Sequence, residues 1–301
     1  MIAIRTVAVV GAGTMGLGIA QVCAMSGYAT LLADMNEAQL SKATSIIRQQ
    51  IESLVAKGKL DTVQRNESLN RLSFTTDLNL VKADLIMEAV VERLSVKQEL
   101  FQRLEKNNTD ECILATNTSS LSINAIASVL KSPGRFLGIH FFNPADRMKL
   151  VELIGGLKTQ TEHLAVAREF LNSLQKTVVD AKDSPGFIVN RVARPYYVEA
   201  LRLLEEKSAD VATIDALMQS AGFRIGPFAL MDLIGLDTNI AVTRSVFERF
   251  DRHIRFLPSP IQQQLVEQGK TGVKAGSFLD CLSSWGFSAL SGGLSSVFSV
   301  E

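Results

Sequence analysis

The feature that most constrains the fold is a glycine-patterned turn near the amino terminus, between an apolar run and a helical stretch. The apolar run covers residues 6–10, glycines follow at Gly11, Gly13 and Gly16, and helical spacing begins at Thr14. Gly11 permits a tight strand-to-helix turn, Gly13 a close approach of the backbone to a pyrophosphate, and Gly16 close packing of helix on strand. A helix start also offers free N–H groups and a positive dipole end. The pattern therefore predicts a dinucleotide-binding strand–turn–helix.

A carboxylate follows where such a site needs one. Asp34 comes directly after the next strand candidate, residues 30–33, and lies 18 residues beyond Gly16. Its carboxylate can accept hydrogen bonds from the hydroxyls of an adenosine ribose and would repel a 2′-phosphate, so NAD is favoured over NADP. The alternative is a plain glycine-rich turn with a helix-capping aspartate. We predict an NAD site formed by the three glycines, Asp34 and the intervening loop residues Thr14 and Met15.

The spacing of apolar residues changes once along the chain. Through the first 183 residues, short apolar runs alternate with helical patterns, which is typical of a parallel sheet with crossover helices. A breaker cluster, Asp-Ser-Pro-Gly at 183–186, ends this pattern, and the apolar spacing beyond it is helical. We therefore predict an α/β fold with two domains: a doubly wound, Rossmann-type NAD-binding domain over residues 1–183 and a mostly α-helical domain over residues 184–301.

Charge and cysteine content narrow the classes of partner. The 31 Lys+Arg residues balance the 31 Asp+Glu residues, so the chain has no electrostatic footprint for nucleic acid or an anionic membrane. The sequence contains no apolar run of about 20 residues, and its first residues do not resemble a secretory signal. The cysteines Cys23, Cys112 and Cys281 are widely spaced and match no zinc or disulfide framework. We expect a cytoplasmic protein without nucleic-acid, membrane or metal partners.

Among the three histidines, His140 is the best candidate for a general base. It ends the apolar run 136–139, and open α/β sheets bind ligands at the carboxyl ends of their strands. Glu152 lies within the apolar run 150–154, where an unpaired charge would be costly, so an imidazole is its sensible partner. If the two strands are neighbours, Glu152 fixes the tautomer of His140, which takes the hydroxyl proton as hydride leaves for NAD. A purely structural pair fits the spacing equally well. We expect His163 and His253 at a surface or interface.

Two other polar positions also have a structural and a functional interpretation. The cluster Thr-Asn-Thr-Ser-Ser at 116–120 follows a strand candidate. It is consistent with a turn and helix cap, or with hydroxyls that face a substrate oxygen. Asn190 lies in the first turn after the breaker, either as a solvent-facing residue or as an amide that orients a carbonyl group.

Taken together, these stretches resemble the 3-hydroxyacyl-CoA dehydrogenase family, including 3-hydroxybutyryl-CoA dehydrogenases. The resemblance extends from about residue 6 to 279. Each block that carries it is moderately specific alone, and all of them in this order are highly specific. The blocks are the glycine loop and residues 88–97, 117–123, 140–144, 150–153, 183–191 and 226–237.

The resemblance implies an activity and roles that spacing only suggests. The activity is reversible NAD-dependent oxidation of an (S)-3-hydroxyacyl-CoA to a 3-oxoacyl-CoA, within fatty acid metabolism such as β-oxidation. His140 would be the general base, oriented by Glu152. Ser119 and Asn190 would hydrogen-bond the reacting oxygen and align the thioester.

The resemblance also assigns residues to the cofactor and to assembly. Glu92 and Lys97 would contact the nicotinamide-ribose side of NAD, and Asn117 is assigned to the same cofactor. Without the resemblance, Glu92 is a helix-start acid and Lys97 an exposed lysine. The helical stretch 37–57 and the residues directly after it would help to hold CoA, with lysines at the end of the stretch as candidates. The second domain would close over the acyl-CoA substrate and form much of a homodimer interface.

Some positions depart from the family pattern. Arg93 stands where a smaller polar residue is common, and Ala-Asp-Arg at 145–147 replaces a stretch that is mostly apolar in the family. Residues 272–278 match the family ending only loosely, and the tail 281–301 matches nothing we recognise. The catalytic set is intact, so these departures concern the acyl chain and turnover.

Two other functions are weighed against the acyl-CoA hypothesis. One is a dehydrogenase of a free hydroxy acid, such as a sugar acid, that uses the same His140 and Glu152. The other is a non-catalytic NAD-binding protein that has kept the fold, since a fold alone never establishes chemistry. Activity on 3-hydroxybutyrate, compared with activity on its CoA thioester, separates the first from the leading hypothesis.

Overall fold

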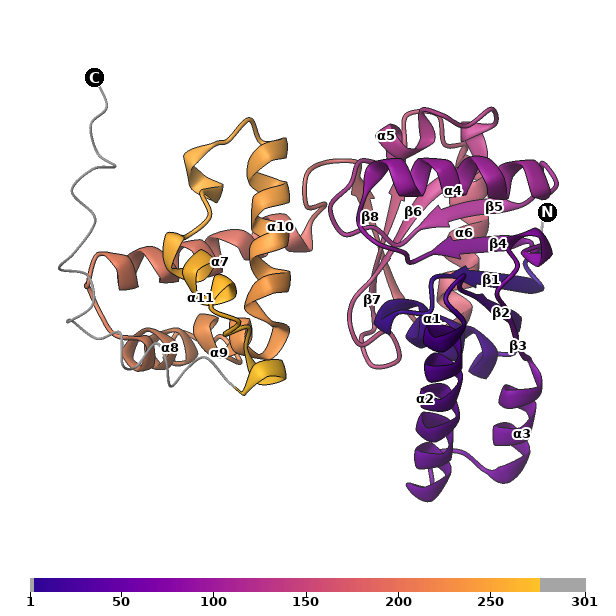
Figure 1. Cartoon of the computed structure of the whole chain (residues 1–301), viewed down its shortest axis with the longest axis horizontal. Coiled ribbons are helices and arrows are strands. Elements are labelled where there is room, and N and C mark those ends of the chain that lie inside the picture. The colour runs from indigo at the N-terminus through magenta and orange to yellow at the C-terminus, as the bar shows by residue number, and fades with distance from the viewer. Residues whose placement is uncertain (1–2, 277–301) are drawn as a thin grey trace. The chain divides into compact units, whose positions relative to one another are not determined.

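The computed structural model describes residues 3–276, so the predictions about Cys281 and the tail lie outside the described residues. The chain divides into two compact units, residues 1–187 and 188–301. The first contains a sheet with helices, and the described part of the second is helical (Figure 1). The predicted α/β class, a doubly wound sheet followed by helices, is confirmed.

The sheet of the first unit has eight strands in the order β3-β2-β1-β4-β5-β6-β7-β8. Its first six positions follow the strand order of doubly wound dinucleotide-binding folds. All neighbours are parallel except β6 and β7, which are antiparallel. The strands are β1 (Thr6–Val10), β2 (Ala29–Ala33), β3 (Leu72–Thr75), β4 (Leu85–Glu88), β5 (Ile113–Thr116), β6 (Phe136–Phe141), β7 (Leu150–Gly155) and β8 (Thr177–Lys182).

Helices cover both faces of this sheet (Figure 1). Side chains alternate along β1: Val7 and Val9 face the core beneath α1, α2 and α6, while Ala8 and Val10 face the core beneath α4 and α5. Burial on both faces explains why the central strands are continuous apolar runs. The helices are α1 (Thr14–Met25), α2 (Glu37–Ala56), α3 (Thr62–Asn70), α4 (Leu94–Asn107), α5 (Ile123–Ala127) and α6 (Thr161–Ser173), with short 3-10 turns at Leu78–Leu80 and Pro133–Arg135.

Two elements of the first unit were not predicted. The helix α3 begins with a capping box, in which Asp61 accepts from the backbone of Gln64 and the Gln64 side chain accepts from the backbone of Asp61. The strand β3 is short and lies at the edge of the sheet, with no fully buried residue. A half-exposed four-residue strand has too few apolar positions for a period-2 signal to stand out.

The second unit packs its helices around an apolar core that includes Tyr197, Leu201, Phe228 and Leu265. The turn before α9 requires glycine, because a Cβ on Gly226 would lie 2.3 Å from the carboxyl carbon of Asp215. The helices are α7 (Val189–Glu205), α8 (Val211–Ser220), α9 (Pro227–Ile234), α10 (Leu236–Arg249) and α11 (Pro260–Glu267), with 3-10 turns at Ile254–Phe256 and Val273–Ala275. Among the described helices, none combines the length and apolar character needed to cross a membrane.

Candidate active site

The glycine turn joins β1 to α1, and contact with the backbone fixes two of its glycines. Gly11 has φ +104°, and a Cβ there would lie 2.5 Å from the carbonyl oxygen of Ala89. A Cβ on Gly16 would lie 1.7 Å from the carbonyl oxygen of Gly11. Gly13 differs, because no described atom lies within 4 Å of the position of its Cβ. The turn therefore leaves its open side at Gly13, directly before Thr14, the first residue of α1.

The amino terminus of α1 also retains free hydrogen-bond donors. Its N-cap is Gly13, which provides no side-chain acceptor for the first N–H groups of the helix. Thr14 and Met15 form the first turn after this cap. The geometry suits a diphosphate, which binds helix amino termini through backbone N–H groups and the helix dipole.

Asp34 follows β2 and contacts the glycine loop directly. One carboxylate oxygen accepts from the backbone N–H of Ala12 at 2.8 Å, and the other accepts from that of Asn36 at 2.9 Å. The side chain of Gln39 adds a bond to the carbonyl oxygen of Ala12 at 2.8 Å. Each oxygen of Asp34 retains a lone pair, so the carboxylate is held beside the loop and can still accept from ribose hydroxyls.

Lys97, on α4, is buried, and its ammonium group reaches the carboxyl end of β4. The prediction from the sequence alone that Lys97 is exposed is therefore wrong. The side chain of Lys97 is 1% exposed, and its ammonium group lies 2.5 Å from Glu88 and 3.2 Å from Glu92. Glu88 also accepts from the hydroxyl of Thr116 at 2.7 Å. Burial raises the pKa of Glu88 even though the Lys97 charge opposes this shift. The charge of the Lys97 ammonium group is therefore compensated within the chain by the two carboxylates that surround it.

Glu92 joins this network to the loop that carries Ser119. One of its oxygens accepts from the Thr118 hydroxyl and from the backbone N–H groups of Ser119 and Ser120, the last two at 3.1 and 3.2 Å. Burial tends to raise the pKa of Glu92, but the Lys97 charge and the hydroxyl donors outweigh burial and lower it. Glu92 is therefore an ionised anchor for the loop. These contacts fix the position of Ser119 at the carboxyl end of β5.

Asn117 ties three strand ends together. Its backbone N–H donates to the carbonyl oxygen of Glu88 at 2.8 Å. Its side-chain oxygen accepts from the backbone N–H of Phe141 at 2.8 Å, directly after His140. The ends of β4, β5 and β6 are thus held in register, and the amide nitrogen of Asn117 points to no acceptor that the structure gives among the described residues.

His140 and Glu152 face each other across the antiparallel pair β6 and β7. They are direct register partners, and the Nδ1 atom of His140 lies 2.7 Å from Oε2 of Glu152. Both side chains are buried, and the rings of Phe142 and Phe187 lie 4.5 and 5.8 Å from the imidazole ring. An ionised Glu152 would keep the proton on Nδ1 and leave Nε2 as an acceptor. This arrangement is the geometry of a histidine oriented by a carboxylate.

The structure gathers most of the predicted site residues at the carboxyl edge of the sheet. The glycine loop, Asp34, Glu92, Asn117, Ser119 and His140 follow strands β1, β2, β4 and β5 or end strand β6. Asn190 is the second residue of α7 in the helical unit, and its role remains a prediction. Sequence reasoning gave no role to Glu88, although it carries the same signal as Glu152, an acid in an apolar strand.

The other two histidines lie away from this edge. His163 was expected at a surface or interface, but the structure shows that it is buried on α6, where its ring contacts the carbonyl oxygen of Gly134 at 3.1 Å. Its helix packs against the sheet, so the polar neighbours that suggested exposure lie on the opposite face. His253 caps the 3-10 turn Ile254–Phe256 and is exposed.

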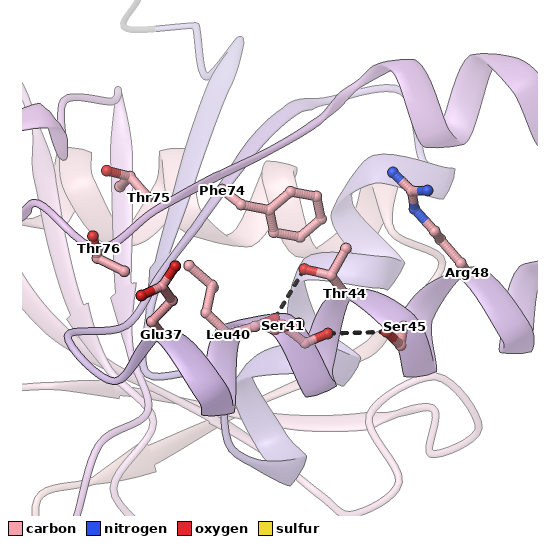
Figure 2. A pocket seen from close by; sticks show the side chains of 9 residues that line it. All are labelled: Glu37, Leu40, Ser41, Thr44, Ser45, Arg48, Phe74, Thr75 and Thr76. Atoms are coloured by element: carbon pink, nitrogen blue, oxygen red, sulfur yellow. Dashed lines mark hydrogen bonds between the residues drawn. The ribbon is translucent and has the colours of Figure 1, made fainter.

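A groove of about 580 Å³ lies outside this set, between α2 and β3 (Figure 2). None of the predicted catalytic or NAD-site residues lines it, but six of its nine lining residues belong to the helical stretch 37–57, which the family resemblance assigns to CoA binding. The hydroxyl groups of Thr44 and Ser45 donate back to carbonyls of their own helix. The lining residues are Glu37, Leu40, Ser41, Thr44, Ser45, Arg48, Phe74, Thr75 and Thr76.

Comparisons with known proteins cover almost the whole described chain. Residues 6–184 match the family model "3-hydroxyacyl-CoA dehydrogenase, NAD binding domain", and residues 186–280 match the C-terminal domain of the same family. The chain is 49% identical to the 3-hydroxyadipyl-CoA dehydrogenase of Escherichia coli K12, over 92% of this chain and 58% of the relative. It is therefore similar to little more than half of that relative's length.

Two further proteins match this chain over most of its length and most of their own. The mitochondrial hydroxyacyl-coenzyme A dehydrogenase of Sus scrofa is 39% identical, over 91% of this chain and 90% of its own length. A crystal structure of (S)-3-hydroxybutyryl-CoA dehydrogenase from Ralstonia eutropha superimposes with a TM-score of 0.87, at 36% identity over 92% of this chain and 98% of that one.

Proposed function

This chain belongs to the 3-hydroxyacyl-CoA dehydrogenase family, and from that membership we propose that it oxidises the 3-hydroxyl group of an (S)-3-hydroxyacyl-CoA with NAD. The reverse reduction of a 3-oxoacyl-CoA uses the same groups. The observation that carries the proposal is the 2.7 Å contact between His140 and Glu152, on the same sheet edge as the glycine turn. This contact supports His140 as a general base, because it lies at the edge where a doubly wound sheet binds its dinucleotide.

In this mechanism His140 moves one proton. Glu152 holds the proton of Nδ1, so the lone pair of Nε2 accepts the proton of the substrate hydroxyl. The C3–H bond breaks at the same time, and bound NAD would supply the acceptor for its hydride. The resulting imidazolium is stabilised by the carboxylate of Glu152, and the buried environment strengthens this attraction.

The cofactor site has a diphosphate end and a ribose end. The open side of the turn at Gly13 and the amino terminus of α1 would bind the diphosphate, and Asp34 would bind the adenosine ribose. Ser119 and Asn190 would bind the reacting oxygen and align the thioester. The contacts of Glu92 and Lys97 support a further role: they position the Ser119 loop beside the nicotinamide end.

Assembly and location belong to the same proposal. A homodimer formed through the helical domain is supported by exposed apolar side chains on α7 and α9, such as Val192 and Leu233. A cytoplasmic location is supported by Cys23 and Cys112, which are buried free thiols and suit a reducing compartment. The same helical domain would close over the acyl-CoA.

The test is a substrate panel monitored by NADH absorbance. The purified chain should reduce NAD with 3-hydroxybutyryl-CoA, 3-hydroxyhexanoyl-CoA or 3-hydroxyadipyl-CoA, the last being the substrate named for the relative from Escherichia coli. Equal activity on free 3-hydroxybutyrate would favour the free hydroxy acid alternative. A chain that binds NAD but reduces it with none of these compounds would be the non-catalytic alternative.

A further inference from the structure

The helix α7 carries a buried arginine. Arg194 is 3% exposed and lies one turn after Asn190. Its Nε donates to the backbone carbonyl of Asn190 at 3.2 Å, and its Nη1 donates to the carbonyl of Asn239 and the hydroxyl of Thr243, both at 3.0 Å. The guanidinium carbon lies 4.8 Å from the centre of the Tyr197 ring. All four partners are neutral.

No carboxylate among the described residues pairs with Arg194. Its Nη2 atom has no acceptor in that part of the chain. Lys97 is equally buried but lies between two carboxylates. Arg194 thus keeps one donor group without an acceptor among the described residues.

A buried cation without an anion is unfavourable. Burial lowers the pKa of Arg194 to about 10, so the guanidinium still remains charged at neutral pH. Neutral acceptors offset only part of the desolvation of a charge. A carboxylate supplies the missing countercharge, because guanidinium groups bind carboxylates through short, charge-assisted hydrogen bonds. A ligand that ends in a carboxylate would supply that countercharge to Arg194.

We propose that Arg194 binds the terminal carboxylate of a dicarboxylic 3-hydroxyacyl-CoA. This inference rests on the proposed function, in which Ser119 and Asn190 bind the reacting oxygen on C3 and align the thioester. Asn190 precedes Arg194 by one helical turn, about 5.4 Å. In a six-carbon dicarboxylic chain, C3 and the terminal carboxyl carbon are separated by three C–C bonds of about 1.5 Å, a span of about 4 Å. The span from C3 to the terminal carboxylate is therefore of the same order as the rise between Asn190 and Arg194.

The matched substrates are 3-hydroxyadipyl-CoA and 3-hydroxyhexanoyl-CoA, which have the same chain length but end in a carboxylate and a methyl group. The wild-type chain should prefer the adipyl compound in kcat/KM. Arg194→Met should reduce that preference by about 10- to 100-fold, the usual range for a hydrogen bond to a charged group. Its activity on 3-hydroxyhexanoyl-CoA should be retained, which also shows that the variant is folded.

Arg191→Met is the control, because Arg191 is an exposed cation on the same helix and packs over the ring of Phe250. It should leave the preference unchanged. If Arg194→Met does not fold, Arg194→Gln keeps an amide donor for Asn239 and Thr243 without the charge, and the same loss of preference is expected.

Two results would overturn the inference: a wild-type chain without preference for the dicarboxylic compound, or a folded Arg194 variant that keeps the preference. A wild-type chain inactive on every acyl-CoA would instead refute the proposed function. The two failures are therefore distinguishable.

Discussion

The two units treat buried charge in opposite ways. In the sheet unit, Lys97 lies between Glu88 and Glu92, His140 lies against Glu152, and the buried Arg135 has the carboxylate of Asp110 3.8 Å away, so each of these groups has a carboxylate within 4 Å. In the helical unit, Arg194 has only neutral partners among the described residues. The difference indicates that the sheet unit contains a pre-organised site, whereas the helical unit depends on a ligand to complete its charge.

The largest expected effect comes from the catalytic pair. His140→Gln should lower kcat by about 10²–10⁴-fold, because glutamine cannot accept and release the hydroxyl proton. The affinity for NADH, measured by fluorescence titration, should change little, because the pair lies apart from the glycine turn in the sequence and in its contacts. Activity that survives this change would show that another group is the base.

The next prediction compares the two buried cations directly. Lys97→Met should destabilise the chain by about 3–5 kcal/mol, because it leaves the buried carboxylate of Glu88 and the partly exposed one of Glu92 without their cation. Arg194→Met removes a cation that has no carboxylate partner but leaves the carbonyls of Asn190 and Asn239 and the hydroxyl of Thr243 without their donor, so its cost without substrate should be smaller, about 1–3 kcal/mol. Urea unfolding measures both variants. Equal losses of unfolding free energy would remove the contrast between the units.

A smaller effect is expected at the ribose carboxylate. Asp34→Ala removes the acceptor of the Ala12 N–H and the proposed partner of the adenosine ribose. NAD should bind more weakly by about 10-fold, a loss typical of a hydrogen bond to a charged group, and discrimination against NADP should relax. Kinetics with both cofactors report this. An unchanged cofactor preference would mean that another group recognises the ribose.

The smallest effect concerns the pH dependence of stability. The pKa of Glu92 is lowered in the folded chain, so folding favours the ionised carboxylate over the protonated one. Its contribution to stability is therefore present above the ordinary glutamate pKa and is lost as the pH falls through the lowered value. Glu92→Gln should flatten the fall of Tm in buffers below the ordinary glutamate pKa, and a Tm profile identical to that of the wild-type chain would contradict this assignment.

Much of the candidate site was predictable because its signals are local. A glycine at a tight turn and an acid after the second strand are sequence features, and they identify Gly11 and Asp34 directly. The partners of buried acids are different. Glu88 and Glu152 give the same signal, a carboxylate in an apolar strand, yet one pairs with a lysine and the other with a histidine. The exposure predicted for Lys97 was wrong for this reason, since its partner lies on another element.

Asp183 shows the same limit at the end of the sheet unit. In the sequence it begins a breaker cluster, but its carboxylate accepts from the Ser122 hydroxyl and the backbone of Ile123 and Asn124 at the start of α5. These residues are about 60 positions away in the sequence. A sequence that interrupts helices and strands can be recognised from local backbone preferences. A side chain that caps a helix far away in the sequence cannot be recognised in this way.

The sequence by itself determined the alternation of strands and helices, the glycine turn and the class of cofactor, because hydrophobic periodicity and backbone sterics act over a few residues. The tertiary structure, through strand order and register, decided which charged groups meet. It therefore also decided which buried charges have an oppositely charged partner in the chain and which are left for a ligand to neutralise. That outcome depends on the whole packed unit, since a one-residue shift of β7 against β6 would turn Glu152 away from His140.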